Sequence, residues 1–178
     1  TATIDDRRTT YDLVRHTAEN VFIPLTVGGG VRSVHDVGLL LEHGADKISV
    51  NSAALANPGL LDEIAAHFGN QVCVISIDAK RDPSLPSGFG VTTHGGRKNA
   101  GIDALAWVTE ACERGAGEVL LNSIDADGTK NGFALDITER VSRNASIPVI
   151  ASGGAGSMIH FVEVFQNDSA DAALAASI

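Results

Sequence analysis

The feature of the sequence that most constrains its fold is an internal repeat. The segment IPLTVGGGVRS at 23–33 matches IPVIASGGAGS at 147–157, and the closing glycines of the two turns, Gly30 and Gly154, lie 124 residues apart (154 minus 30). The match continues beyond a helical segment, where GADKISVNS aligns with SADAALAAS. Any two strand–helix units look broadly alike, but an IP pair followed by GG at a fixed spacing is poorly explained by chance. We therefore expect two related halves.

Short apolar runs alternate with helical segments in both halves. The runs are VFIPLTV, DKISVN, QVCVISID, GEVLLNSI, IPVIAS and DAALAAS. Repeated units of a strand and a helix favour parallel strands joined by right-handed crossovers. The long connection 80–99 differs, because its GFGVTTHGG stretch predicts a small hairpin. A long loop after the carboxyl end of a strand is typical of an active site.

Capping residues predict where the helices begin. Ser33, Asp103 and Ser157 are candidate N-caps, and Asn57-Pro58 opens a further helix. The apolar positions expected to face inward are Trp107, Val108, Ala111 and Cys112 in the helix after Asp103, and Ile159, Val162 and Phe165 in the helix after Ser157.

Composition narrows the class of protein. The chain is 44% hydrophobic and only 4% aromatic, so its core is expected to be aliphatic. A net charge of −9 argues against binding to nucleic acid or to an anionic membrane. The six histidines show no metal-binding spacing, so we expect neither a metal nor a cofactor. Cys73 and Cys112 are expected to be buried thiols, which fits a cytoplasmic protein.

The number of strands predicts an unusual form of a common fold. Two halves of four strand–helix units would close an eight-stranded barrel, but 178 residues show only six strand signals. We expect one α/β domain, residues 1–178, that is an incomplete (β/α)8 TIM barrel with strands 3 to 8, lacking the first two strands and the last helix.

The two glycine-rich turns predict phosphate binding. Glycine lets the backbone approach an anion closely, and the helix that follows directs free N–H groups at it. One such turn is weak support, but here two turns are related by the repeat, and each is near the end of the next strand. In a symmetric barrel they would lie on opposite sides of the mouth, so the expected substrate carries a phosphate at each end. One site could instead be a vestige of duplication.

Other polar residues follow or begin the apolar runs. Asp78 closes QVCVISID, so it is expected to point into the barrel mouth as a general acid or base, or else to cap the next loop. In the segment 122–129, Asn122 suits orientation of a substrate oxygen and Gly128 suits a phosphate contact. Lys47 and Glu118 lie at the opposite ends of their strands, where surface capping is the simplest interpretation.

Six motifs together resemble the cyclase subunit of imidazole glycerol phosphate synthase, a lyase of histidine biosynthesis: TVGGGVRS, DKISVNSAA, ISIDAKR, SIDADGTKNG, ASGGAG and ADAALAAS. The resemblance runs from residue 1 to residue 178. The related isomerase of the pathway shares the barrel and the phosphate turns, but not this combination. The resemblance implies that ammonia from a glutaminase partner converts phosphoribulosyl-formimino-aminoimidazole-carboxamide ribotide to imidazole glycerol phosphate and aminoimidazole carboxamide ribotide.

The resemblance also implies roles for particular residues. Asp78 would be one of two acid/base aspartates, and Asn122 and Ser152 would support the catalytic site. Lys47 and Glu118 would belong to a charged ring that gates ammonia, and Asp46 would lie on the face toward the glutaminase. The residues implied for one phosphate are Gly30, Asn51 and Ser52, and those for the other are Gly128, Gly154, Ala176 and Ser177.

From the resemblance, we expect the first strand of that family, with its second catalytic aspartate, to be missing from these 178 residues. An open barrel exposes strand edges and an apolar interior, so we expect the isolated chain to be inactive as a cyclase and to self-associate. The alternative function is a phosphate-binding fragment that does not catalyse and that oligomerises.

Overall fold

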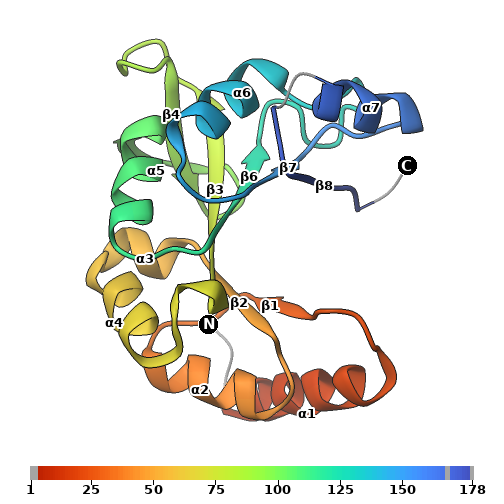
Figure 1. Ribbon diagram of the computed structural model, residues 1–178. Coiled ribbons are helices and arrows are strands. Elements are labelled where there is room, and N and C mark those ends of the chain that lie inside the picture. The colour runs from red at the N-terminus through yellow and green to blue at the C-terminus, as the bar shows by residue number, and fades with distance from the viewer. Residues whose placement is uncertain (1–3, 167–168, 177–178) are drawn as a thin grey trace.

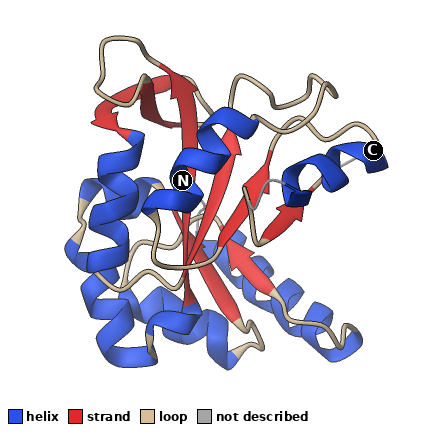
Figure 2. Ribbon diagram, turned by 45° about the horizontal axis from the view of Figure 1, so that its top comes forward, coloured by secondary structure: helices blue, strands red, loops and turns tan. Residues whose placement is uncertain are grey.

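The computed structural model describes residues 4–166 and 169–176, in which a curved parallel sheet carries helices on its convex side (Figures 1 and 2). The helices are α1 (Ile4–Asn20), α2 (Val34–Glu42), α3 (Ser52–Ala56), α4 (Gly59–Phe68), α5 (Ala104–Glu113), α6 (Leu135–Asn144) and α7 (Met158–Gln166), with a 3-10 turn at Asn70–Val72. The strands are β1 (Thr26–Gly28), β2 (Lys47–Val50), β3 (Cys73–Arg81), β4 (Phe89–Thr93), β5 (Lys98–Asp103), β6 (Glu118–Ser123), β7 (Val149–Ser152) and β8 (Ala172–Leu174).

The six expected strands are all present and all parallel, in the order β1-β2-β3-β6-β7-β8. Within the described residues β1 and β8 each pair with one neighbour, so the sheet does not close. Figure 1 shows the resulting open C, with α1 and α2 at one end and α7 at the other. The prediction of an incomplete TIM barrel is confirmed.

The hairpin in the long connection is longer than predicted. β4 pairs antiparallel with β3, and β5 pairs with β4 as far as Asp103. The carboxylate of Asp103 caps α5, accepting from the N–H groups of Leu105 and Ala106, and it also accepts from Ser87. Burial acts to raise the pKa of Asp103, but these hydrogen bonds outweigh it and lower the pKa.

The repeat is confirmed in three dimensions. Helices α2 and α7 begin at Val34 and Met158 and end at Glu42 and Gln166, so both ends are related by the same 124-residue shift (158 minus 34, 166 minus 42). One tie between neighbouring strands is also duplicated. The carboxylate of Asp46 accepts from the backbone N–H of Leu25 at 2.7 Å, and that of Asp171 accepts from the N–H of Val149 at 2.8 Å.

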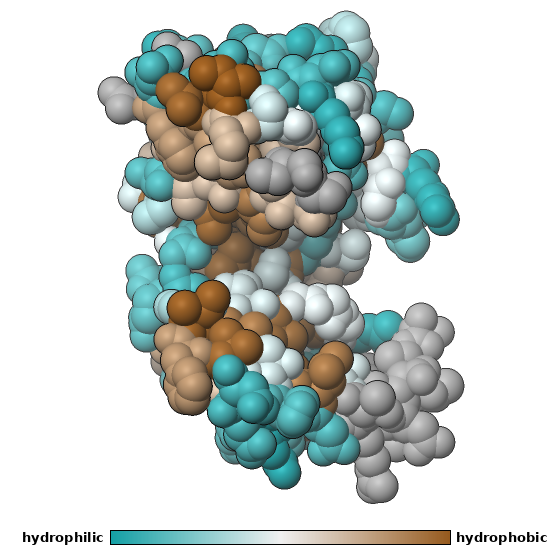
Figure 3. Space-filling model, turned by 90° about the vertical axis from the view of Figure 1, so that its right-hand side faces the viewer, coloured by the Kyte–Doolittle hydropathy of each residue, from teal (hydrophilic) through white to brown (hydrophobic). Residues whose placement is uncertain are grey.

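Burial alternates along the strands, because one face of the sheet is covered and the other is open. On the convex side the side chains pack under the helices and are almost fully buried, as in Ile48, Ile75, Leu121 and Val149. Side chains of the concave side, such as Ser76 and Leu120, are mostly half-buried. A closed barrel would bury both faces. Seen into the open side of the C, apolar residues line the hollow between its two ends (Figure 3).

The predicted inward face of α7 is wrong. Ile159, Val162 and Phe165 are exposed, whereas Val164 is buried and Phe161 packs edge-on against Phe133, with ring centroids 5.4 Å apart. Six of the nine residues of MIHFVEVFQ are apolar and cover a broad arc of the helix, so the periodicity did not show which part of that arc faces the sheet. The predicted face of α5 is largely confirmed, because Trp107, Val108 and Ala111 are buried and Cys112 is half-buried.

Truncation of one buried and one exposed isoleucine tests where the core lies. Ile75 is 0% exposed and Ile23 is 72% exposed. Ile75→Ala is expected to lower the free energy of unfolding by about 2–5 kcal/mol, and Ile23→Ala by less than about 0.5 kcal/mol. Urea unfolding followed by circular dichroism measures both. Equal losses would show that the convex-side core is misplaced.

Candidate functional site

Three predicted site residues lie in register across the carboxyl edge of the sheet. Asp78 of β3 is paired with Asn122 of β6, and Asn122 is paired with Ser152 of β7. All three are half-buried, on the open concave side. Because the carboxyl ends of parallel strands lie at the same edge, these three residues form a continuous row near that edge.

The carboxylate of Asp78 is held by two amides. Asn51 Nδ2 donates to Oδ2 at 3.1 Å, and Asn122 Nδ2 donates to Oδ1 at 3.2 Å. One amide follows β2 and the other lies on β6, so the carboxylate is fixed from both sides. From the sequence, Asn51 was expected to contact a phosphate and Asn122 to orient a substrate oxygen. Their contacts with Asp78 were not predicted.

Asn51 also faces the first predicted phosphate site. A cavity of about 630 Å³ opens here, and its lining includes Gly29, Gly30, Asn51 and Ser52. Asn51 Oδ1 is buried without a partner among the described protein atoms, so it can accept from a bound ligand. The structure thus brings together Gly30, Asn51 and Ser52, as predicted.

The backbone of the first glycine turn has the predicted form. Gly29 and Gly30 have φ values of 91° and 76°, in the left-handed region that favours glycine. Ser33 caps the helix that follows, because its Oγ accepts from the N–H of Asp36 at 3.2 Å. The turn therefore leads directly into a helix N-terminus, which favours an anion.

The second glycine turn repeats this backbone but is more tightly packed. Gly153 and Gly154 have φ values of 90° and 100°, and a Cβ on Gly154 would overlap the carbonyl oxygen of Gly132. A pocket of about 80 Å³ here is lined by Asp127, Gly128, Lys130, Ser152, Gly153, Gly154, Ala155, Leu174, Ala175 and Ala176. Gly128, Gly154 and Ala176 are thus together, whereas Ser177 lies outside the described residues. The sequence did not predict a role for Lys130, which is the cationic residue in the lining of this pocket.

Lys47 and Glu118 form an ion pair on the concave side at the amino ends of the strands. It bridges β2 and β6 across β3, and its side chains are 28% and 22% exposed. Val74, the β3 residue in register with Glu118, is buried. Because both side chains are only partly exposed, the interpretation as simple surface capping residues does not fit this pair. Its role as an ammonia gate stays a prediction.

The remaining chemistry of the described residues is limited. Burial raises the pKa of the Cys73 thiol to about 11, so this cysteine stays protonated and unreactive. Among residues 4–166 and 169–176, no group of three His, Cys, Asp or Glu side chains is placed to hold a metal ion. No helix in the same ranges has the length and apolar character needed to cross a membrane.

Comparison with known proteins agrees with this geometry. The chain matches the family model of histidine biosynthesis proteins over residues 1–178. It is 61% identical over 178 residues to the imidazole glycerol phosphate synthase subunit HisF of Leifsonia xyli subsp. xyli, covering all of this chain and 70% of that relative. The same subunit of Streptomyces coelicolor is 58% identical over 178 residues, with the same coverage. That of Cutibacterium acnes is 59% identical over 162 residues, 91% of this chain and 64% of the relative.

A curved parallel sheet with helices on its convex side and glycine turns at its carboxyl edge defines the TIM-barrel class of α/β proteins. Within that class, the chain belongs to the histidine biosynthesis protein family, on the branch of the HisF cyclase subunit of imidazole glycerol phosphate synthase. It spans between 64% and 70% of the length of these three relatives.

Substitution of alanine for the last glycine of each turn, Gly30→Ala and Gly154→Ala, tests how differently the two turns are packed. Both substitutions place a Cβ at positive φ, at a cost of about 1–2 kcal/mol. Gly30 has open space around it, whereas Gly154 does not, so Gly154→Ala is expected to cost about 1–3 kcal/mol more than Gly30→Ala. Free energies of unfolding in urea measure the difference, and equal losses would contradict the packing of the second turn.

Proposed function

We propose that this chain provides two phosphate sites and one acid/base carboxylate for the cyclase reaction of imidazole glycerol phosphate synthase. The substrate would be phosphoribulosyl-formimino-aminoimidazole-carboxamide ribotide, which carries two phosphates. The observation that carries the proposal is the position of Asp78 on the carboxyl edge of the sheet, between two repeat-related glycine turns.

The two turns would bind the ends of the substrate. Backbone N–H groups at Gly30 and Ser52 would bind one phosphate, and those at Gly128 and Gly154 the other. The chain's net charge of −9 is compatible with this, because such sites use backbone dipoles and need few cationic side chains. Ser177, which lies outside the described residues, is proposed for the second phosphate beside Ala176.

Asp78 would transfer protons at the reacting centre. Ammonia attacks the ribulosyl part of the substrate, and ring closure and cleavage release imidazole glycerol phosphate and aminoimidazole carboxamide ribotide. These steps need a group that accepts a proton and returns it. Asn51 and Asn122 would keep the Asp78 carboxylate aimed at the substrate, and the Ser152 hydroxyl, in the same row, would contact the substrate beside it.

The opposite end of the strands would face the source of ammonia. Lys47 and Glu118 lie at this end, where a charged pair could control entry to the interior. Next to it, the segment before β1 exposes apolar side chains, with Phe22 94% exposed and Ile23 72% exposed. Asp46 is exposed beside them. We propose this surface as the docking site of a glutaminase subunit, in a cytoplasmic complex.

Replacement of Asp78 tests its role in catalysis. The assay is ammonia-dependent turnover by a chain extended with the residues that the Leifsonia xyli relative has beyond the matched region. Asp78→Asn keeps the size and one acceptor oxygen but cannot take up the proton, so the turnover rate is expected to fall by at least about 100-fold with substrate affinity retained. Glu113→Gln, at an exposed acid on α5, is the matched control. Turnover that survives Asp78→Asn would refute the acid/base role.

A second candidate function is a phosphate-binding fragment that self-associates without catalysis. The half-buried concave face and the edges of β1 and β8 favour it, since an open sheet edge pairs readily with another chain. Size-exclusion chromatography with light scattering is expected to show a dimer or larger species for the 178-residue chain, with no measurable cyclase turnover. A monomer would contradict self-association, and turnover at the rate of a complete enzyme would contradict the lack of catalysis.

A further inference from the structure

The loop at 124–134, between β6 and α6, decides whether the second phosphate site is formed. It carries Gly128 and Lys130 to the pocket at the second glycine turn. The loop contains no helix or strand, so contacts with other parts of the molecule must hold it in place. These contacts lie on two sides.

The glycine turn holds the inner side of the loop. The N–H of Gly132 donates to the carbonyl oxygen of Gly154 at 2.8 Å. The backbones approach so closely that a Cβ on Gly154 would overlap Gly132, and one on Gly156 would overlap Lys130. This side therefore depends on the glycines already predicted from the sequence.

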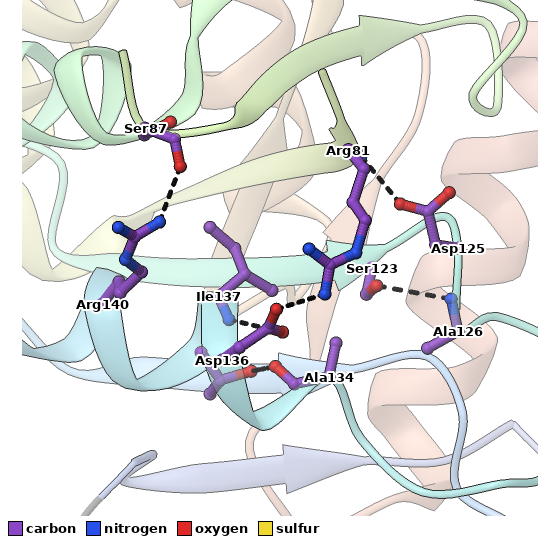
Figure 4. Close-up of polar contacts among 10 residues, drawn as sticks. Arg81, Ser87, Ser123, Asp125, Ala126, Ala134, Asp136, Ile137 and Arg140 are labelled. Atoms are coloured by element: carbon purple, nitrogen blue, oxygen red, sulfur yellow. Dashed lines mark hydrogen bonds and ion pairs between the residues drawn. The ribbon is translucent and has the colours of Figure 1, made fainter. Parts of the chain in front are cut away.

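Strand β3 holds the outer side of the loop through its last residue, Arg81. The backbone N–H of Arg81 donates to Asp125 Oδ2 at 2.7 Å, at the start of the loop. Its guanidinium forms an ion pair with Asp136, in the first turn of α6 just after the loop ends. Figure 4 shows Asp125 and Asp136 approaching Arg81 from different directions. One residue thus fixes both ends of the loop.

The side chain of Arg81 is itself supported by the hairpin. Its guanidinium carbon lies 5.1 Å from the centre of the Phe89 ring on β4, a cation–π contact. The N–H of Ile124 also donates to the carbonyl oxygen of Ala79 on β3, at 2.9 Å. The start of the loop is therefore bonded to the strand that carries Asp78.

We propose that Arg81 and Asp125 are positioning residues of the second phosphate site, which set the phosphate-binding loop at a fixed distance from Asp78. The proposal rests on the proposed function of that site in phosphate binding. Neither residue needs to touch the substrate, because each acts through the backbone of the loop.

The two contacts of Arg81, its ion pair with Asp136 and its backbone hydrogen bond to Asp125, are expected to differ in strength. The side chains of Arg81 and Asp136 are 64% and 48% exposed, and water weakens such an ion pair. Asp125 accepts from a backbone N–H through a charged oxygen, which makes a stronger hydrogen bond. Loss of the Asp125 carboxylate should therefore disturb the site more than loss of the Arg81 side chain.

Titration of the protein with inorganic phosphate, followed by ¹⁵N–¹H NMR, tests the proposal. The amides of Gly128 and Gly154 report the second site, and those of Gly30 and Ser52 report the first site as an internal control. Asp125→Ala is expected to weaken phosphate at the second site about tenfold and to leave the first within about twofold. Arg81→Ala is expected to weaken only the second site, by about two- to threefold.

Asp125→Asn separates positioning from simple electrostatics. Asparagine removes the same negative charge as alanine but keeps an oxygen that can accept from Arg81. Positioning predicts that this variant binds phosphate more tightly than Asp125→Ala, because the asparagine oxygen keeps part of the tie to Arg81, while Asp125→Ala binds phosphate more weakly than the unaltered protein. If charge alone mattered, both variants would bind phosphate more tightly, and the proposal would be wrong. Glu113→Ala controls for removal of a distant exposed acid.

The possible failures are distinguishable. If phosphate shifts neither Gly128 nor Gly154 in the unaltered protein, the second site and the proposal both fail. If it shifts them equally in Asp125→Ala, or if both sites weaken together, only the positioning role fails. Where Asp125→Ala does not fold, Arg81→Ala carries the test: weakening confined to the second site supports the proposal, and no change contradicts it.

Discussion

The bridge from Asn51 to Asp78 to Asn122 is the interaction on which the rest of the site depends. It joins the polar ends of β2, β3 and β6 through one carboxylate. Because these strands are parallel, the bridge fixes the centre of the carboxyl edge, and the two glycine turns flank it there. Asn51 takes part in both features, since it holds Asp78 and lines the first phosphate cavity.

Duplication explains why the flanking sites are similar, and loop packing explains why they are not identical. Both turns have paired glycines at positive φ followed by helices related by one constant shift. The first turn opens onto a wide cavity, whereas the second is pressed against the loop that supplies Gly128. The second site therefore needs the additional support that β3 provides through Arg81 and Asp125.

Much of the fold could be predicted from sequence, because each strand and most helices leave local signals. Ser33 and Asp103 cap helices as expected, and the repeat predicted the matched turns. The inward face of α7 could not be predicted, since the apolar residues of that segment cover a broad arc of the helix and its contact with Phe133 comes from a distant loop. The second strand of the hairpin was missed as well, because KNAGID lacks an apolar pattern.

The site was predicted as a set of residues, but not as a network. Asp78, Asn122 and Ser152 each follow an apolar run. This pattern predicted that they lie at the carboxyl edge of the sheet, but it did not predict their hydrogen bonds. Arg81, Asp125 and Lys130 are ordinary loop or strand-end residues in sequence, and only the folded chain shows their contacts. Asp125 and Asp127 look alike in SIDADG, yet Asp125 bonds to Arg81 while Asp127 lines the pocket.

The most direct test of the account is a crystal structure of the protein with inorganic phosphate. We predict two bound phosphates, one at Gly30 and Ser52 and the other at Gly128 and Gly154, with the carboxylate of Asp78 between them. Phosphate at only one turn, or at neither, would contradict the central claim that the duplicated turns form the two ends of one bisphosphate site.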